Sequence, residues 1–331
     1  MRIVVIGTGF GARVVAPAFA ATAGCEVVDV VSPRDDDAVD RAIARPDVDL
    51  VSVHSPPFLH ARHVRSTLAE GKAVLCDKPF ALDATEAAAL VTDAAAAGVV
   101  ALCNFEFRFH PVRRLLRDLV RTDALGSIEH VHWTHLSAGS RVPLRRYGWL
   151  FDRDRGGGWI GAWGSHAVDT IRWCFGEVVA VDAQSRIDVV ERPDEHGGLH
   201  ACTAEDGITA TLQIESGATV AIDSSFAASA SVAPRLTVLG AEAVCEIVGD
   251  ARVILRRGDG TSEDLTPKAT PAGERTVSDR HDDPMRRFAE VVRDVVTGGE
   301  VPPGVPTFAD GHACAVVLDQ LRARPPLTKT R

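Results

Sequence analysis

One histidine of this sequence combines a reactive side chain with an unusual approach along the chain. His166 follows three consecutive glycines in "RGGGWIGAWGSHAVDTIRW", residues 155–173. Apolar residues then recur at the spacing of one helical face: Ile160, Trp163, Ala167 and Ile171. This pattern, closed by Gly176, predicts a helix entered through a flexible glycine hinge. Because an imidazole titrates near neutrality, His166 is suited to moving a proton.

The neighbours of His166 leave its role open. Residues three and four apart stack on a helix, which places Ala162 before His166 and Asp169 after it. A carboxylate at position 162 would orient the imidazole, and the sequence has none there. The alternative is a core histidine satisfied locally, with Asp169 paired to Arg172.

A lysine stands at the end of a buried strand. Residues 48–82, "VDLVSVHSPPFLHARHVRSTLAEGKAVLCDKPFAL", predict a strand, a Pro-Pro turn, a helix and a second strand that ends at Asp77, just before Lys78. Ligands of open α/β sheets bind at the carboxyl ends of the parallel strands. Lys78 is therefore predicted at a functional edge, the alternative being a surface lysine without a role.

A glycine-rich loop lies near the start of the chain, before both Lys78 and His166. "RIVVIGTGFGARVVAPAFAA", residues 2–21, has a strand, then Gly7, Gly9 and Ala12 in the G-x-G-x-x-G/A spacing, then a helical pattern. Such a loop lets a pyrophosphate approach the backbone and the helix amino terminus. The predicted contacts are Gly7, Thr8, Gly9, Phe10, Gly11 and Ala12. A strand–helix packing turn with no ligand is the alternative.

The loop after the second strand bears on the cofactor. An NAD site usually places an acid there, for the ribose 2′-hydroxyl, whereas this chain has Ser32 followed by Arg34 in "SPRDDD". A hydroxyl and a guanidinium can hold a 2′-phosphate, which favours NADP over NAD. Asp35 to Asp37 weaken that preference, because they make the local field less positive.

Composition narrows the classes of protein. A chain of 331 residues predicts two domains, and a net charge of -9 with scattered basic residues disfavours a nucleic-acid partner. Seven cysteines without a C-x-x-C pair indicate reduced thiols, and the absence of a membrane span or signal peptide predicts a cytoplasmic protein. A zinc site in "EHVHWTH" is disfavoured, because His130 and His132 share a strand face that His135 does not.

The second half of the chain alternates apolar and polar residues. After Ser127 the strand-like segments predict a sheet with one covered face. They are "SIEHVHW", "GITATLQIE", "ATVAIDSSF", "RLTVLG" and "AVCEIVG". One late helix, "DPMRRFAEVVRDVV", precedes a Pro-rich linker.

Four motifs in order resemble one family, the glucose-fructose oxidoreductase, inositol dehydrogenase and rhizopine-catabolism (Gfo/Idh/MocA) oxidoreductases. "VIGTGFGA" resembles their dinucleotide loop, "VHSPPFLH" their "ATPpxxH" turn, "CDKP" their "EKP" motif and "GGGWIGAWGSHAVD" their "GGGxLxDxGxHxxD" helix. The resemblance implies an α/β Rossmann domain over residues 1–124, then an α+β domain over 125–331 with a large, mostly antiparallel sheet. A closing helix near 307–324 would pack back on the first domain.

The same resemblance implies functional residues. Lys78 and His166 would flank the reacting carbon, and the cofactor would also contact Ser55, Pro56, His60 and Asp77. The aspartate of the family helix falls on Ala162, and Asp77 stands where the family has glutamate. The short segment between Ser32 and the strand at Asp49 lacks one strand-and-turn element usual near the adenine.

Candidate substrate contacts lie in three segments. "CNFEFRFHPVRRLL" offers Asn104, Glu106, Arg108 and His110, which could equally serve as structural hydrogen-bonding groups. "RYGWLFD" offers Tyr147 and Trp149 to cover a sugar ring. On the helix, Trp163 and Asp169 complete the set with His166.

Two classes of function stay open. The first is an NADP-dependent dehydrogenase or reductase of a sugar, sugar derivative or cyclitol, assembled as a homodimer or homotetramer. The second, favoured by Ala162, keeps the dinucleotide but not this chemistry, either as a lyase or hydrolase or as a non-catalytic binding protein.

Overall fold

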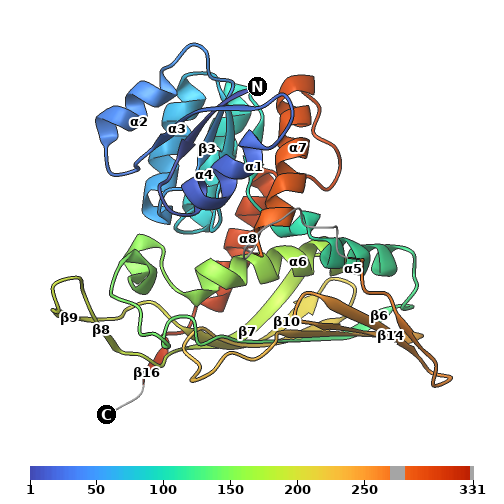
Figure 1. Cartoon of the computed structure of the whole chain (residues 1–331). Helices are drawn as coiled ribbons and strands as arrows, with labels where there is room; N and C mark the ends of the chain where they lie inside the picture. The colour runs from blue at the N-terminus through green and yellow to red at the C-terminus, as the bar shows by residue number, and fades with distance from the viewer. Residues whose placement is uncertain (269–279, 329–331) are drawn as a thin grey trace. The chain divides into compact units, whose positions relative to one another are not determined.

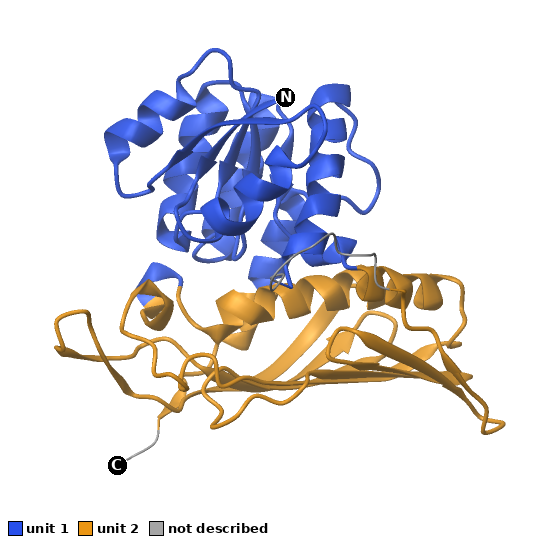
Figure 2. Ribbon diagram, viewed as in Figure 1, with its two compact units in different colours: residues 1–110, 154–156, 275–316 blue, residues 111–153, 157–274, 317–331 orange. Residues whose placement is uncertain are grey.

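The computed structural model describes residues 1–268 and 280–328, which fall into two compact units (Figures 1 and 2). Unit 1 comprises residues 1–110, 154–156 and 275–316, and unit 2 comprises residues 111–153, 157–274 and 317–331. The predicted domains over residues 1–124 and 125–331 stay a prediction.

Unit 1 is built on a parallel sheet of five strands in the order β2-β1-β3-β4-β5. The strands are β1 (Arg2–Ile6), β2 (Glu26–Val31), β3 (Leu50–Val53), β4 (Ala73–Cys76) and β5 (Ala101–Cys103). β3 and β4 are apolar except for Ser52 and are buried along their whole length, as parallel strands covered on both faces require. In the described residues β2 is an edge strand of this sheet, and the predicted loss of a strand near the adenine stays a prediction.

Local signals define the helices of unit 1. They are α1 (Ala16–Ala20), α2 (Asp36–Ile43), α3 (His60–Ala69), α4 (Ala84–Ala97), α7 (Asp282–Gly298) and the first part of α8 (Phe308–Leu321), with shorter turns η1 (Gly11–Val15), η2 (Pro57–Leu59) and η3 (Glu106–Phe109). Asp83 begins α4 by accepting a hydrogen bond from Glu86 N at 2.8 Å, and Gly98 ends it with a φ of 65°.

The late helix α7 returns to the first sheet. Met285, Phe288 and Val292 are fully buried in one apolar cluster with Phe19 of α1 and with residues of β1, β3 and β4. The sequence predicts this helix but not its place, because an amphipathic face does not specify which sheet covers it.

Unit 2 holds a sheet of nine strands in the order β15-β14-β13-β12-β6-β11-β10-β7-β16, of which only β11–β6 and β16–β7 are parallel pairs. The strands are β6 (Ile128–Leu136), β7 (Val178–Ile187), β10 (Gly207–Ile214), β11 (Thr219–Ser225), β12 (Arg235–Gly240), β13 (Ala243–Val248), β14 (Arg252–Arg257), β15 (Ser262–Asp264) and β16 (Leu327–Thr328). The predicted large, mostly antiparallel sheet is confirmed.

Helices α5 (Pro111–Arg121) and α6 (Ser165–Phe175) lie over one face of that sheet (Figure 1). Along β10 buried residues alternate with the exposed side chains of Thr209, Thr211 and Gln213, so the opposite face is polar there. A separate pair, β8 (Glu191–Pro193) with β9 (Leu199–Ala201), and the turns η4 (Trp149–Phe151), η5 (Arg153–Arg155) and η6 (Ile160–Gly164) complete the elements.

Two further sequence expectations can be compared with the structure. All seven cysteines lie among the described residues as thiols rather than disulfides, and all but the half-buried Cys25 are buried. Among the helices in the described ranges, none combines the length and the apolar character needed to cross a bilayer.

Candidate active site

The carboxyl ends of adjacent strands in unit 1 bring polar residues into one row. Because Val53 of β3 pairs with Cys76 of β4, and Cys76 with Cys103 of β5, the next residues along each strand lie side by side. They are His54, Asp77 and Asn104. Lys78 follows Asp77 directly and is half-buried. This edge is where open α/β sheets bind their ligands.

The glycine loop occupies the neighbouring position of the same edge. Gly7 has a φ of +147°, and a Cβ there would lie 2.5 Å from the His54 carbonyl oxygen, so only glycine fits. Gly9 has no atom within 4 Å of a would-be Cβ, which leaves its backbone open to a ligand. The chain then enters η1 and α1 without a side-chain cap at Phe10. This open backbone before a helix fits the pyrophosphate of a dinucleotide.

The end of β2 shows how Ser32 and Arg34 are arranged. The Ser32 hydroxyl accepts a hydrogen bond from Arg34 N at 3.3 Å, and the Arg34 side chain is exposed. Asp35 caps α2 by accepting from Ala38 N at 2.9 Å, which engages one of its carboxylate oxygens. Since β2 is an edge strand, the outer side of this region is open to solvent.

Asp77 is the most connected side chain of the row. Its Oδ1 accepts from Lys78 N at 2.9 Å and from Asn104 Nδ2 at 3.2 Å, while its Oδ2 faces His54 Nδ1 at 3.2 Å. Burial alone raises the pKa of Asp77, but the contact with His54, followed by the charge of Lys78, outweighs burial and holds that pKa well below its usual range. The carboxylate is therefore a fixed negative charge beside the lysine.

His60 and Ser55 hold the Pro-Pro turn. His60 Nε2 donates to the Ser55 carbonyl at 2.7 Å, and its Nδ1 lies 3.3 Å from the Phe80 carbonyl. Burial lowers the pKa of His60, which favours the neutral ring. His60 thus joins the turn after β3 to the segment after β4, and the cofactor contacts predicted for Ser55, Pro56 and His60 stay predictions.

Two residues proposed to line the substrate have structural partners in unit 1. The Arg108 guanidinium is buried and pairs with Asp310 at 2.7 Å, and the carboxylate of Glu106 lies 2.6 Å from His281 Nδ1. Burial raises the pKa of Asp310, but Arg108 and hydrogen bonds from Thr307 outweigh it and lower that pKa. Within unit 1, Glu106 and Arg108 therefore make the structural contacts that the sequence allows as the alternative to substrate binding.

His166 lies in unit 2, on a helix as the sequence predicts, and it stands in the first turn of α6. Both His166 and Asp169 are buried, and the His166 carbonyl accepts from Thr170 Oγ1 at 2.8 Å. The turn before it, η6, is a π-helix, so Ala162 does not stack one regular α-turn before the histidine. The helix ends at Gly176, as predicted.

The glycines before this helix form a packed turn rather than the predicted flexible hinge. Gly157 N donates to the Asp152 carbonyl at 2.9 Å and Gly158 N to the Leu150 carbonyl at 2.8 Å. A Cβ on Gly158, whose φ is +103°, would collide with the Glu205 carboxylate. Glycine is needed here for close approach, because Glu205 itself accepts from Ile160 N at 3.1 Å.

Two of the aromatic candidates of unit 2, Trp163 and Tyr147, contact other rings. Trp163 is buried edge-on against Trp133, with ring centroids 5.5 Å apart, and is stacked with Trp159 at 5.9 Å. Tyr147 stacks on His200 at 4.8 Å, and Trp149 begins η4. Their contacts with substrate stay predictions.

Sequence reasoning missed His54. The signal was present, because His54 follows a strand that ends in Ser52-Val53, where extended backbone puts the serine and the histidine on one face, and Asp77 follows the next strand of the sheet. Pairing the two strand ends in register would have placed the imidazole beside the carboxylate.

Comparisons with known proteins agree with this architecture. Residues 1–105 match "Oxidoreductase family, NAD-binding Rossmann fold", and residues 113–246 match "GFO/IDH/MocA C-terminal domain". The chain is 30% identical over 231 residues to an uncharacterized oxidoreductase of Synechocystis sp., covering 65% of this chain and 62% of that protein. It is 29% identical over 157 residues to levoglucosan dehydrogenase of Pseudarthrobacter phenanthrenivorans, covering 47% and 40%.

A solved structure of levoglucosan dehydrogenase in complex with NADH and L-sorbose shares the fold. The TM-score is 0.83 at 20% identity, over 97% of this chain and 95% of that one. Because both halves of the sequence match the two parts of one family in order, and the fold agrees along the chain, this protein belongs to the GFO/IDH/MocA oxidoreductase family.

Proposed function

We propose that this protein is an NAD(P)-dependent oxidoreductase acting on a secondary alcohol or ketone of a sugar, sugar derivative or cyclitol. The observation that carries the proposal is the edge of the unit 1 sheet, where the open backbone at Gly9 and the strand end at Lys78 belong to one row. The likeness to levoglucosan dehydrogenase, whose complex contains NADH and a sugar, supports it.

Each proposed catalytic group has a defined task. A bound nicotinamide would supply the hydride chemistry. The Lys78 ammonium would stabilise charge on the substrate oxygen and contact the nicotinamide ribose, and His166 would exchange the hydroxyl proton. Asp169, buried on the same helix, is the candidate to orient His166, because position 162 is alanine.

Further contacts are proposed from the sequence motifs. For the cofactor they are Gly7, Thr8, Gly9, Phe10, Gly11, Ala12, Ser32, Arg34, Ser55, Pro56, His60 and Asp77. For the substrate they are Asn104, Arg108, Tyr147, Trp149, Trp163 and Asp169.

The decisive experiment follows reduced nicotinamide by absorbance while the protein is offered a panel of sugars and cyclitols. His166→Ala should abolish turnover and change dinucleotide affinity less than about threefold, since a proton-transfer group acts in the chemical step. Lys78→Ala should lower turnover and weaken dinucleotide binding. Exposed His196→Gln is the matched control. Dinucleotide binding without turnover on any compound would favour the lyase, hydrolase or non-catalytic class instead.

Ala162→Asp tests how His166 is oriented. If the missing carboxylate limits the reaction, the variant should raise turnover on an accepted sugar. If Asp169 already orients the ring, a further carboxylate should be neutral or harmful, because a partly buried charge without a partner is unfavourable.

We further propose a preference for NADP(H), supported by Ser32 and the exposed Arg34 at the end of β2. Arg34→Ala should raise the Kd for NADP(H) by about tenfold or more and leave the Kd for NAD(H) nearly unchanged, because a charge-assisted contact with the 2′-phosphate is lost. Equal weakening of both cofactors, measured by calorimetry, would refute the preference.

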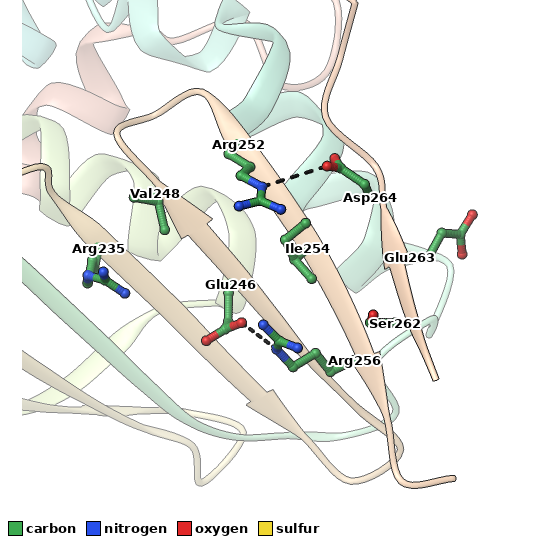
Figure 3. Close-up of a pocket in the computed structure, with 9 residues that line it drawn as sticks. All are labelled: Arg235, Glu246, Val248, Arg252, Ile254, Arg256, Ser262, Glu263 and Asp264. Carbon is green, nitrogen blue, oxygen red and sulfur yellow. Dashed lines mark hydrogen bonds and ion pairs between the residues drawn. The ribbon is translucent and has the colours of Figure 1, made fainter. Parts of the chain in front are cut away.

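We propose that the open face of the nine-stranded sheet joins copies of this chain as a homodimer or a dimer of dimers. A depression on this part of unit 2 mixes apolar and charged side chains of both signs (Figure 3). It is lined by Arg235, Glu246, Val248, Arg252, Ile254, Arg256, Ser262, Glu263 and Asp264. Mixed charges can complement themselves across a two-fold axis. A strictly monomeric mass by light scattering at micromolar concentration would reject the assembly.

A further inference from the structure

Two residues of the row, His54 and Asp77, also line up with Ser52, and these three side chains form a buried row of polar contacts at the carboxyl edge of the unit 1 sheet. His54 Nε2 lies 2.7 Å from Ser52 Oγ, and His54 Nδ1 lies 3.2 Å from Asp77 Oδ2. A ring nitrogen with a lone pair would be repelled by an ionised carboxylate, so the ring proton belongs on Nδ1, which faces the Asp77 charge without the alignment of a full hydrogen bond, and Nε2 accepts from the serine hydroxyl. The row thereby fixes one tautomer and one orientation of the imidazole.

The row continues to the proposed catalytic lysine. The other oxygen of Asp77 accepts from the backbone N of Lys78 at 2.9 Å and from Asn104 Nδ2 at 3.2 Å. Ser52 is fully buried, so the row can position other groups but cannot present its hydroxyl to a substrate. His54 thus acts on one oxygen of a carboxylate whose second oxygen holds the lysine's backbone.

Two departures from the family motifs meet in this contact. His54 stands at the alanine of the "ATPpxxH" pattern, and Asp77 stands at the glutamate of "EKP". Aspartate is shorter than glutamate by one methylene, a reach of about 1.5 Å. The imidazole lies beside this shorter side chain, with its Nδ1 3.2 Å from Asp77 Oδ2.

We propose that His54 is a positioning residue for Lys78, and that His54 and Asp77 replace the alanine–glutamate pair of the motifs as one unit. His54 orients the carboxylate of Asp77, and Asp77 holds the backbone of Lys78 and the amide of Asn104. The catalytic role of Lys78 itself rests on the function proposed above.

A double-mutant cycle tests the unit. His54→Ala should lower kcat on an accepted sugar by about tenfold or more with a smaller change in KM, because the lysine is misplaced for the reaction rather than for substrate capture. Asp77→Glu should be similarly impaired, because its added methylene meets the imidazole. The double variant His54→Ala/Asp77→Glu should recover to within about threefold of the wild type.

Two further variants separate positioning from packing. His54→Asn places an amide nitrogen near the position of Nδ1 and should retain most of the activity. Val64→Ala removes a fully buried side chain of α3 and should lower the midpoint of thermal unfolding without changing kcat. If His54→Ala lowers only the unfolding midpoint, as Val64→Ala does, His54 has a packing role and the inference is wrong.

The same cycle measured on dinucleotide affinity keeps this inference apart from the proposed function. Because Lys78 is proposed to contact the nicotinamide ribose, each single variant should raise the Kd for the dinucleotide by about threefold or more. The double variant should restore the affinity of the wild type. Restoration by the double variant with no turnover on any sugar would support the His54–Asp77 unit and reject the oxidoreductase. Additive effects on both affinity and kcat, in a protein that does turn over sugars, would overturn the unit alone.

Nuclear magnetic resonance of the histidine side chains gives a third outcome that needs no substrate. Correlations between ring protons and nitrogens, assigned by loss of the signals in His54→Asn, should show the Nδ1–H tautomer for His54. Observation of the Nε2–H tautomer would overturn the arrangement, because Nδ1 would then have no proton to offer Asp77.

Discussion

Gly7 and Gly9 stand two residues apart in the same loop, yet alanine should affect them in opposite ways. At Gly7 the φ of +147° is a region that only glycine adopts readily, which costs alanine about 1–3 kcal/mol. The new Cβ would also lie 2.5 Å from the His54 carbonyl oxygen, and relieving such an overlap costs about 1–3 kcal/mol. At about 4 kcal/mol in total, Gly7→Ala should lower the midpoint of thermal unfolding by roughly 8–16 °C.

Gly9→Ala should leave the fold intact and damage binding. No atom lies within 4 Å of its would-be Cβ, and alanine restricts the unfolded chain, so the unfolding midpoint should be unchanged or slightly higher. The methyl group would stand where a pyrophosphate must approach the backbone. Loss of one charge-assisted hydrogen bond, about 1.5–3 kcal/mol, corresponds to a dinucleotide Kd raised about 10- to 100-fold.

Thermal melts without cofactor and calorimetric titration with NAD(H) and NADP(H) measure the two effects separately. Gly98→Ala is the matched control, because Gly98 has a φ of +65° and open space around it, so alanine adds backbone strain of about 1–2 kcal/mol alone. Wild-type affinity in a well-folded Gly9→Ala protein would refute the placement of the pyrophosphate, and an unchanged melt of Gly7→Ala would refute the strain argument.

Three further outcomes concern stability. Burial lowers the pKa of His63 to about 4. As the pH falls below about 6.5, the unfolded chain therefore binds a proton at this residue while the folded chain does not. The free energy of unfolding should decrease over this range, by about 2 kcal/mol at pH 5. Denaturant titrations at pH 7 and 5 should show a smaller loss in His63→Asn and the wild-type loss in His196→Gln, and parallel profiles for all three would contradict this origin. Gly158→Ala should lower the unfolding midpoint of unit 2, because its Cβ meets the Glu205 carboxylate; a melt identical to wild type would mean that the turn relaxes freely. Arg322→Ala should lower the free energy of unfolding, measured with urea, by about 3–5 kcal/mol, because it leaves the buried carboxylate of Glu205 without the cation paired with it at 2.8 Å. A loss under about 1 kcal/mol would show that water reaches the carboxylate.

Several features of this protein follow from the sequence alone because their causes are local. The glycine spacing that begins at Gly7, the mostly apolar strands β3 and β4 and the alternation along β10 each depend on residues within a single element. The short stretch between Ser32 and Asp49 cannot hold a helix, a turn and an extra strand, and β2 is accordingly an edge strand. These signals suffice for the fold class and for the candidate positions of Lys78 and His166.

Other features depend on which residues meet across long separations. Arg108 and Asp310 are far apart in sequence, and only the folded unit 1 shows that the guanidinium proposed for substrate is engaged by a carboxylate. The same holds for α7, whose apolar face could cover either sheet until packing with Phe19 assigns it to the first.

The three glycines before His166 make the same distinction between local and tertiary causes. Their sequence predicts flexibility, because glycine has no Cβ, but whether that freedom serves motion or close packing depends on what lies beside it. In the structure it is the Glu205 carboxylate, 47 residues after Gly158, that excludes a side chain. The sequence by itself determined the elements and the reactive residues they carry, since backbone preference and periodicity act over a few residues. Tertiary structure alone decided which side chains are partners, because strand register and packing join residues that the chain keeps far apart.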